Sequence, residues 1–369
     1  MSKATAAPPV GLAADGRLPL PWLAEPLARG GALSQAHAVL IHGPAGAGHL
    51  ALGLLLAQAQ LCEQRPPAAA GATRSPCGQC RACHLVGTRV HPDLLIVIPD
   101  LLRVQLNWVD DEDSKLAKAD AKPSKDIRVE QVRQAIAWSQ QTSGRGQGKV
   151  MLVHPADALN GPAANALLKT LEEPPGRLRL LLTSADPERL LPTVRSRCQR
   201  LRLDLPEAPA AITWLDLHGV ADPQALLRAA GGSPLEALAW AGEGLTAALL
   251  AALPGRLAAG DASLLAGRAI PRVVDLLLRL AHDLQVQAAG GTPRYFDAAW
   301  LPGGAADPAA LRHWQAALLR TARHDEHPWN AGLLIESLVS QATALWPGGS
   351  GGRPPPRPLR AGASLHSAR

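Results

Sequence analysis

The chain has 369 residues, of which 47% are apolar and 18% charged, and its formal net charge is +6. This length allows two or three domains with at least one large core, and the composition excludes a chain that is disordered throughout. The apolar runs are too short and too interrupted to span a membrane. We expect no signal peptide, no membrane contact and a cytoplasmic location. The modest positive charge permits a nucleic-acid or acidic partner without requiring one.

Strands and helices are predicted to alternate over the first 205 residues. In chain order the predicted elements are a strand at 36–43, a helix from 49 towards 62, a strand at 91–100, a helix at 127–138, a strand at 149–159, a helix at 161–175, and a strand leading into a short helix within 178–198. This alternation predicts an α/β fold with a doubly wound, mainly parallel sheet. The charged stretch 101–126 is expected to be a surface insertion.

Residue types at the ends of the helix at 161–175 support its boundaries. Asn160 is a suitable N-cap, Pro162 suits the first turn, and the pair Pro174–Pro175 stops the helix. Beyond residue 205 the pattern becomes almost entirely helical, with a small unit at 207–245 and a Leu/Ala-rich bundle at 246–346. The Gly-, Pro- and Arg-rich tail that follows is expected to be disordered.

A glycine-rich loop between the first strand and its helix is similar to a phosphate-binding loop. Such a loop reads G-x-x-x-x-G-K-[ST], where the Lys neutralises phosphate and the hydroxyl binds Mg²⁺. Gly43 and Gly48 match the two glycines, but His49 and Leu50 replace the Lys and the Ser/Thr. We therefore expect a loop that keeps the fold but does not hydrolyse nucleotide.

The end of the third strand gives the same indication. Catalytic ATPases of this type carry an acidic pair there to hold Mg²⁺ and polarise water. Here His154 and Pro155 follow the strand, and Asp157 lies further into the turn. Two independent defects therefore predict an inactive nucleotide site.

Four of the five cysteines, Cys62, Cys77, Cys80 and Cys83, have the spacing C-x₁₄-C-x₂-C-x₂-C. Four thiolates on a short knuckle favour a closed structural Zn²⁺ site. Four free thiols and an iron–sulfur cluster are the alternatives, although the fourth Cys-Pro of a bacterial ferredoxin run is missing. His84 and His91 are further possible ligands, but four cysteines already fill the shell. Cys198 is expected to be a packed residue.

These motifs together resemble the delta-prime subunit family of the bacterial DNA polymerase III clamp loader. The resemblance rests on Cys62 with CGQCRAC, on VHPDLL, on ANALLKTLEEPP and on DPERLLPTVRSRC. It begins near Pro21, is dense to about residue 205 and thins through the helical half. The stretch 101–126 and the tail 350–369 are not typical of the family.

The resemblance implies three domains and their roles. The expected parts are a flexible N-terminus at 1–20, a RecA-like AAA+ domain at 21–205 with a zinc module at 62–83, a helical lid at 206–245, an all-α collar domain for oligomerisation at 246–346, and a disordered tail at 347–369. In this family the chain joins ATPase subunits and a clamp-opening delta subunit in a ring. The ring places the sliding clamp on primed DNA.

The same resemblance implies a site that acts on a neighbour. Arg197 in the Ser196-Arg197-Cys198 motif matches the family's trans-acting arginine finger, with Ser196 in support. Active relatives carry an Arg in the lid where Leu235 stands here. The chain is therefore expected to have no catalytic activity of its own and to need no cofactor except structural zinc. The alternatives are an autonomous AAA+ ATPase, and a zinc-knuckle protein that binds nucleic acid or acts in redox chemistry.

Overall fold

The computed structural model describes residues 11–64, 75–108, 123–303, 306–323 and 329–346. The chain divides into two compact units, Met1–Ala211 with Ser233–Leu235, and Ile212–Gly232 with Glu236–Arg369. The finer division into N-terminus, AAA+ domain, lid and collar stays a prediction. The tail at 347–369, most of the predicted insertion and residues 1–10 lie outside the described residues.

The first unit is built on a five-stranded parallel sheet with the order β2-β3-β4-β1-β5. The strands are β1 Ala38–His42, β2 Leu94–Val97, β3 Lys149–Val153, β4 Leu178–Ser184 and β5 Gln199–Arg202. The central strands β1, β3 and β4 are almost fully buried, as apolar strands of a parallel sheet must be when helices cover both faces. The predicted α/β fold is confirmed, although β5 was not predicted.

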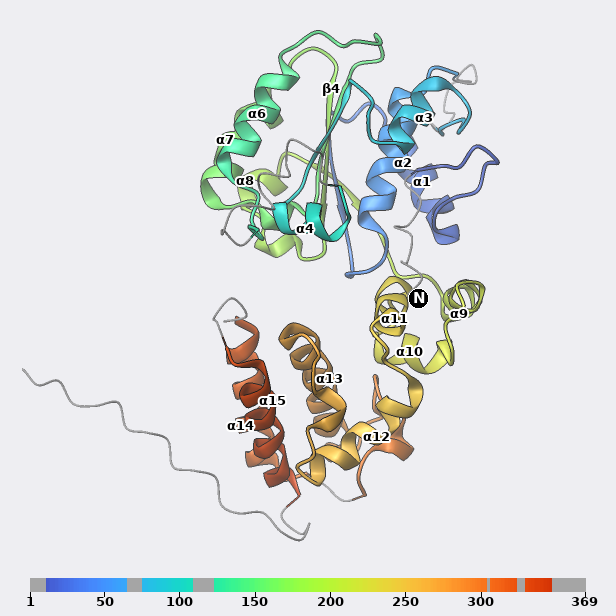
Figure 1. The fold of residues 1–369 in the computed structure, drawn as a ribbon. Coiled ribbons are helices and arrows are strands. Elements are labelled where there is room, and N and C mark those ends of the chain that lie inside the picture. The colour runs from blue at the N-terminus through green and yellow to red at the C-terminus, as the bar shows by residue number, and fades with distance from the viewer. Residues whose placement is uncertain (1–10, 65–74, 109–122, 304–305, 324–328, 347–369) are drawn as a thin grey trace, which may run out of the picture. The chain divides into compact units, whose positions relative to one another are not determined.

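Helices cover both faces of this sheet (Figure 1). Helices α1 and α2 pack on one face, while α6 and α7 pack together on the other. The α-helices of this part of the chain are α1 Ala24–Ala32, α2 His49–Leu61, α3 Arg81–Gly87, α4 Asp100–Gln105, α6 Val129–Ser139, α7 Gly161–Glu172 and α8 Pro192–Arg195. Short 3₁₀ turns are η1 Pro21–Leu23, η2 Ala156–Ala158 and η3 Pro187–Arg189.

Helix α7 has the predicted boundaries. The side chain of Asn160 accepts a hydrogen bond from the Ala163 N–H at 2.9 Å, and Pro162 lies in the first turn. The helix ends at Glu172, just before the proline pair. Its buried face, which includes Leu167 and Leu171, joins the core beneath the sheet. The cap fixes where α7 begins, and the apolar stripe holds the helix against the core.

The remaining α-helices make up the second half of the chain. They are α9 Ala208–Leu217, α10 Pro223–Ala229, α11 Pro234–Gly242, α12 Ala247–Ala258, α13 Ile270–Ala288, α14 Pro308–Arg323 and α15 Ala331–Ala342. The 3₁₀ turns are η4 Ser263–Leu265, η5 Ala298–Trp300 and η6 Thr343–Leu345. Helix α13 packs against α14, and α14 packs against α15. The predicted change from an α/β to an all-helical pattern is confirmed.

A buried carboxylate organises the long helix α13. Asp283 is fully buried and accepts hydrogen bonds from the N–H groups of Arg294, Tyr295 and Phe296 at 2.7–2.8 Å. These bonds offset the cost of burying the charge and attach the segment that follows α13 to the helix. Asp283 therefore has a structural role.

Among the described helices, no single one is both long and apolar enough to cross a membrane, and only α11 and α12 taken together, with an 80° bend between them, have the necessary length and composition.

Candidate functional site

The glycine-rich loop runs from the end of β1 to the start of α2, as predicted. Gly43, Gly46 and Gly48 all have positive φ, at 154°, 78° and 106°. A Cβ on Gly43 would lie 1.8 Å from the carbonyl oxygen of Leu203, so no other residue fits there. The loop thus has the backbone expected of a phosphate loop at the N-terminus of a helix.

The side chains in this loop differ from those of a phosphate loop. His49, at the first position of α2, is 7% exposed, and its Nε2 atom is buried with no hydrogen-bond partner among the described residues. Burial lowers the pKa of His49 to about 4, so the imidazole is neutral at pH 7. Leu50 is half-buried and offers no oxygen to a metal ion. The loop therefore has neither the cation nor the hydroxyl that a nucleoside triphosphate with Mg²⁺ needs.

The carboxyl ends of β3 and β4 lie beside each other and carry a second neutral histidine, which is paired with a threonine hydroxyl. His154 Nδ1 lies 2.6 Å from Thr183 Oγ1, and burial lowers the pKa of His154 to about 3. Asp157 lies in η2, where its Oδ1 atom is buried with no partner among the described residues. Sequence reasoning missed Thr183. The only feature of the sequence that could have indicated Thr183 is a hydroxyl side chain near the end of an apolar strand.

Residues 11–23, which we call the N-terminal strap, lie against the loop. Leu20 is 2% exposed, and a Cβ on Gly48 would lie 2.5 Å from its Cδ1 atom. The indole N–H of Trp22 donates to the carbonyl of Ala47 at 2.9 Å. The strap therefore supports the loop from outside with an apolar side chain and one hydrogen bond.

The four cysteines predicted to bind metal lie together. Their Sγ atoms all lie within 4.8 Å of one another. The Cys62–Cys80 and Cys77–Cys83 pairs of sulfur atoms are 3.9 and 3.8 Å apart. Zinc with four thiolates at ~2.3 Å in a tetrahedron separates the sulfur atoms by about 3.8 Å, so this cluster could bind zinc.

The surroundings of these thiols also fit a metal ion. Main-chain N–H groups of Cys80 and Cys83 point at the sulfur atoms of Cys77 and Cys80, at 3.3 and 3.4 Å. Burial raises the pKa of Cys62 and Cys83, so these thiols need a nearby cation to ionise at neutral pH. Cys198 lies outside the cluster, and its Sγ atom donates to the carbonyl of Val194 at 3.4 Å.

We call the cysteine cluster and its short helix α3 the cysteine knuckle. Hydrogen bonds through Gln58 connect the knuckle to the N-terminal strap. Gln58 of α2 is 1% exposed, and its amide donates to the carbonyl of Cys83 at 3.0 Å. The same side chain accepts from the N–H of Leu12 at 2.7 Å and donates to the Leu12 carbonyl at 3.3 Å. Gly78 lies close enough that a Cβ there would be 2.6 Å from the Ala13 carbonyl. Leu12, which lies within the 1–20 stretch that was expected to be flexible, is thus hydrogen-bonded to α2.

The two histidines near the knuckle are not part of the cluster. The His91 Nδ1 atom accepts from the N–H of Asp93 at 3.0 Å, and His84 is exposed. Asp93 is 1% exposed and accepts hydrogen bonds from Ser143, Gly144 and Arg145. Arg145 in turn pairs with Glu63, next to Cys62. The segment 91–93 therefore links the knuckle to the rest of the α/β unit, through Asp93, Arg145 and Glu63.

Arg197 follows α8 and is held by α7. Its Nε atom donates to Glu172 Oε1 at 2.8 Å, its Nη2 atom donates to the same oxygen, and its Nη1 atom donates to the Thr193 carbonyl at 2.8 Å. Ser196, the other predicted residue, donates to that same carbonyl at 3.2 Å. The Arg197 side chain is 33% exposed, and none of its hydrogen bonds reaches the glycine loop. The predicted site residues therefore form three separate groups, at the loop, at the knuckle and at Arg197.

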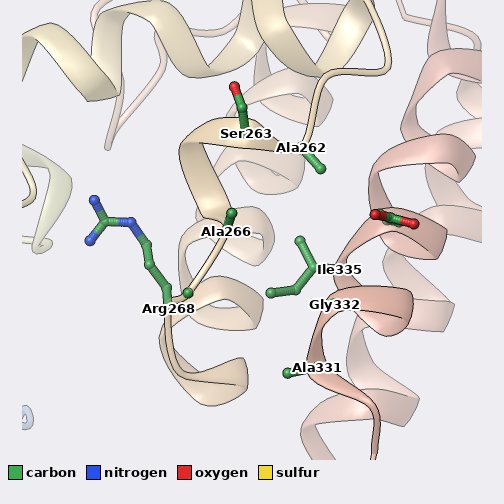
Figure 2. Close-up of a pocket in the computed structure, with 9 residues that line it drawn as sticks. Ala262, Ser263, Ala266, Arg268, Ala331, Gly332 and Ile335 are labelled. Carbon is green, nitrogen blue, oxygen red and sulfur yellow. The ribbon is translucent and has the colours of Figure 1, made fainter.

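A cavity of about 310 Å³ lies in the second unit, between the segment around η4 and helix α15 (Figure 2). Its lining is mostly small or apolar, with Ala266, Ala331, Gly332 and Ile335 among the residues. Arg268 also lines it, but its guanidinium donates to the main-chain carbonyls of Leu264, Glu243 and Gly244. Ser263 and Glu336 are the other polar residues of its lining.

A second cavity of about 260 Å³ lies at the amino ends of β3 and β4. Lys149 and Arg177 line it, but Lys149 donates to the carbonyl of Trp138 at 2.7 Å and Arg177 to that of Gly146 at 3.0 Å. Both cations are therefore engaged by the protein's own main chain.

Comparison with known proteins confirms the resemblance seen in the motifs. The family model described as "DNA polymerase III, delta subunit" matches residues 31–207. The chain is 41% identical over 220 residues to DNA polymerase III subunit delta' of Pseudomonas aeruginosa, and 35% identical over 226 residues to that of Escherichia coli. These alignments span 58% and 59% of this chain, and 59% and 60% of the relatives.

A solved structure was also similar. It is a DNA polymerase III gamma subunit-related protein from Thermotoga maritima, with 16% identity and a TM-score of 0.45 over 87% of this chain and 98% of that one.

Proposed function

We propose that this chain is a non-hydrolysing subunit of the DNA polymerase III clamp loader that supplies Arg197 to the ATP site of a neighbouring subunit. The observation that carries the proposal is a contrast between two sites in one α/β unit. The glycine loop holds a buried, neutral His49, whereas Arg197 is held at the surface with its charge accessible. The similarity to delta' subunits over 58% of the chain supports the same assignment.

An arginine held in this way suits phosphoryl transfer in a partner. Charge builds up on the transferring phosphoryl group, and a guanidinium placed beside it stabilises the transition state. Ser196 shares the Thr193 carbonyl with Arg197 and so helps to fix the turn that carries it. The chain would thus provide one arginine and a rigid surface, while the neighbour would provide the nucleotide and Mg²⁺.

The proposed partners are the ATPase subunits and the delta subunit of the loader, with the sliding clamp and primed DNA engaged through the assembled complex in the cytoplasm. Relatives named tau and tau/gamma subunits match this chain at 31% identity, which supports an architecture shared among the subunits. Leu235, where active relatives have an arginine in the lid, agrees with a chain that binds no nucleotide.

We further propose that Cys62, Cys77, Cys80 and Cys83 hold a structural zinc ion. The supporting observation is the sulfur–sulfur spacing near 3.8 Å. A bound zinc would neutralise the thiolates and leave no open position, so it would stabilise the knuckle without taking part in catalysis.

Assembly is the experiment that tests the proposed function. The purified chain is mixed with tau/gamma and delta subunits and analysed by size-exclusion chromatography with mass measurement. A complex that contains this chain and loads the sliding clamp onto primed DNA supports the proposal. A chain that stays separate, hydrolyses ATP alone, or binds primed DNA alone with steep salt dependence contradicts it.

A further inference from the structure

We propose that Glu172 is a positioning residue for Arg197: it holds the guanidinium in the orientation that a neighbouring ATP site requires. This inference rests on the proposed function. It goes beyond that function because it assigns a role to the acidic end of α7.

The geometry fixes each nitrogen of the guanidinium. Nε and Nη2 both donate to Oε1 of Glu172, so the carboxylate covers one edge of the group. Nη1 donates to the Thr193 carbonyl at 2.8 Å and makes a long contact of 3.4 Å to Ser196 Oγ. Arginine has five N–H donors, so these four contacts leave one on Nη2 that has no acceptor among the described residues. The guanidinium is thus oriented but keeps a donor for an outside oxygen.

Glu172 is itself fixed by the fold. It is the last residue of α7, one position after the buried Leu171, and the proline pair follows it two positions later. The core beneath the sheet holds α7 in place, and α7 packs against α8. A carboxylate on this helix end is therefore attached to a rigid element, whereas an arginine on a surface turn would otherwise sample many rotamers.

Helix stability does not explain an acid at this position. The C-terminus of a helix carries partial negative charge, so a carboxylate there is unfavourable unless a cation is nearby. Arg197 is that cation. Because Glu172 is 49% exposed and Arg197 33% exposed, an ordinary ion pair here would contribute little to folding stability. We therefore place its role in the orientation of Arg197.

The test compares Glu172→Gln, Glu172→Asp and the control Glu173→Gln in the reconstituted clamp loader. Glu173 is the exposed neighbour at the same helix end, with the same charge. We expect Glu172→Gln to lower kcat for DNA-stimulated ATP hydrolysis about fivefold, which corresponds to one exposed charged pair, with KM for ATP and Tm unchanged. Glu172→Asp should recover part of this loss, and Glu173→Gln should have no effect.

Two further measurements separate this inference from the proposed function. In an Arg197→Ala background, Glu172→Gln should have no additional effect, because its influence passes through Arg197. In the isolated chain, the ¹⁵Nε signal of Arg197 should shift with Glu172→Gln and not with Glu173→Gln. If Arg197→Ala slows the complex but Glu172→Gln does not, the positioning role of Glu172 is wrong and the proposed role of Arg197 is retained. If Glu172→Gln slows the complex as much in the Arg197→Ala background as in the wild-type background, the positioning role is also wrong. If Arg197→Ala has no effect, the proposed function itself fails.

Discussion

His154 Nδ1 lies 2.6 Å from Thr183 Oγ1, where the neighbouring parallel strands β3 and β4 end. In open parallel sheets, ligands bind outside the carboxyl ends of the strands. Here that position holds a neutral imidazole and a hydroxyl that satisfy each other, beside a loop with a second neutral histidine. The loop thus has the positive-φ glycines of a phosphate loop, and the two histidines beside it are neutral.

The two buried histidines predict a loss of stability in acid. The pKa of His49 falls from 6.5 to about 4 on folding, because burial disfavours the charged form. Its contribution is therefore fully present above pH ~6.5 and is lost as the pH falls through about 4, since the unfolded chain binds the proton first. At ~1.4 kcal/mol per pKa unit, the loss is about 3 kcal/mol.

Urea unfolding between pH 7 and 4 measures this effect. His49→Leu, which cannot be protonated, should make the pH dependence less steep and leave the part that is due to His154, whereas His313→Leu at an exposed position should leave it unchanged. An equally steep profile in the His49 variant would contradict the lowered pKa of His49.

Nucleotide binding is the second prediction. The isolated chain should not bind ATP with Mg²⁺ at micromolar concentration, because a neutral His49 and an apolar Leu50 replace the cation and the metal ligand. His49→Lys alone should not produce hydrolysis, since no acidic residue directly follows β3. Calorimetric titration and a phosphate-release assay check both points. Turnover by the wild-type chain alone would show that the loop is functional.

The cysteine knuckle provides the third prediction. Cys80→Ser should abolish zinc binding and lower the stability by about 4 kcal/mol or more, as expected for the loss of a structural metal. Elemental analysis and thermal unfolding measure the two effects. Cys198→Ser is the matched control, because this thiol is half-buried but lies outside the cluster. A wild-type chain that contains iron, or no metal at all, would rule out the zinc proposal.

The fourth prediction concerns Gln58, which joins the N-terminal strap to the knuckle. Gln58→Leu leaves the N–H and C=O of Leu12 and the C=O of Cys83 without their partner, at ~1–3 kcal/mol for each group that stays buried. Hydrogen exchange at residues 12–20 should become faster, and the strap should be cut sooner by protease. Gln134→Leu on the exposed side of α6 is the control. Unchanged exchange at Leu12 would show that Gln58 does not hold the strap.

Local patterns in the sequence were sufficient for most of the fold and for part of the site. Four strands followed from apolar runs, the ends of α7 from Asn160 and the proline pair, and the cysteine cluster from ligand spacing. Strand β5 was missed because only Leu201 of its four residues is buried, so the run does not read as apolar. Because β5 is short and lies at the edge of the sheet beside β1, its sequence has no apolar pattern strong enough to predict a strand.

Long-range partners could not be predicted in this way. Gln58 and Leu12 are 46 residues apart, His154 and Thr183 are 29 apart, and Arg197 and Glu172 are 25 apart. Each pair meets because the sheet and its helices bring distant segments together. No periodicity in the sequence records such a contact, so the strap, the neutral pair and the orientation of Arg197 emerged only from the structure.

DNA-stimulated ATP hydrolysis by the reconstituted clamp loader tests the central claim most directly. The wild-type chain is compared with Arg197→Ala and with the control Arg189→Ala, which removes the same charge at an exposed position nearby. We expect Arg197→Ala to slow hydrolysis by at least about tenfold without loss of assembly, because a trans arginine stabilises transition-state charge in the neighbour. The Arg189 variant and the wild type should be equally active, and the chain alone should be inactive. An unchanged rate for Arg197→Ala, or hydrolysis by the chain alone, would contradict the account.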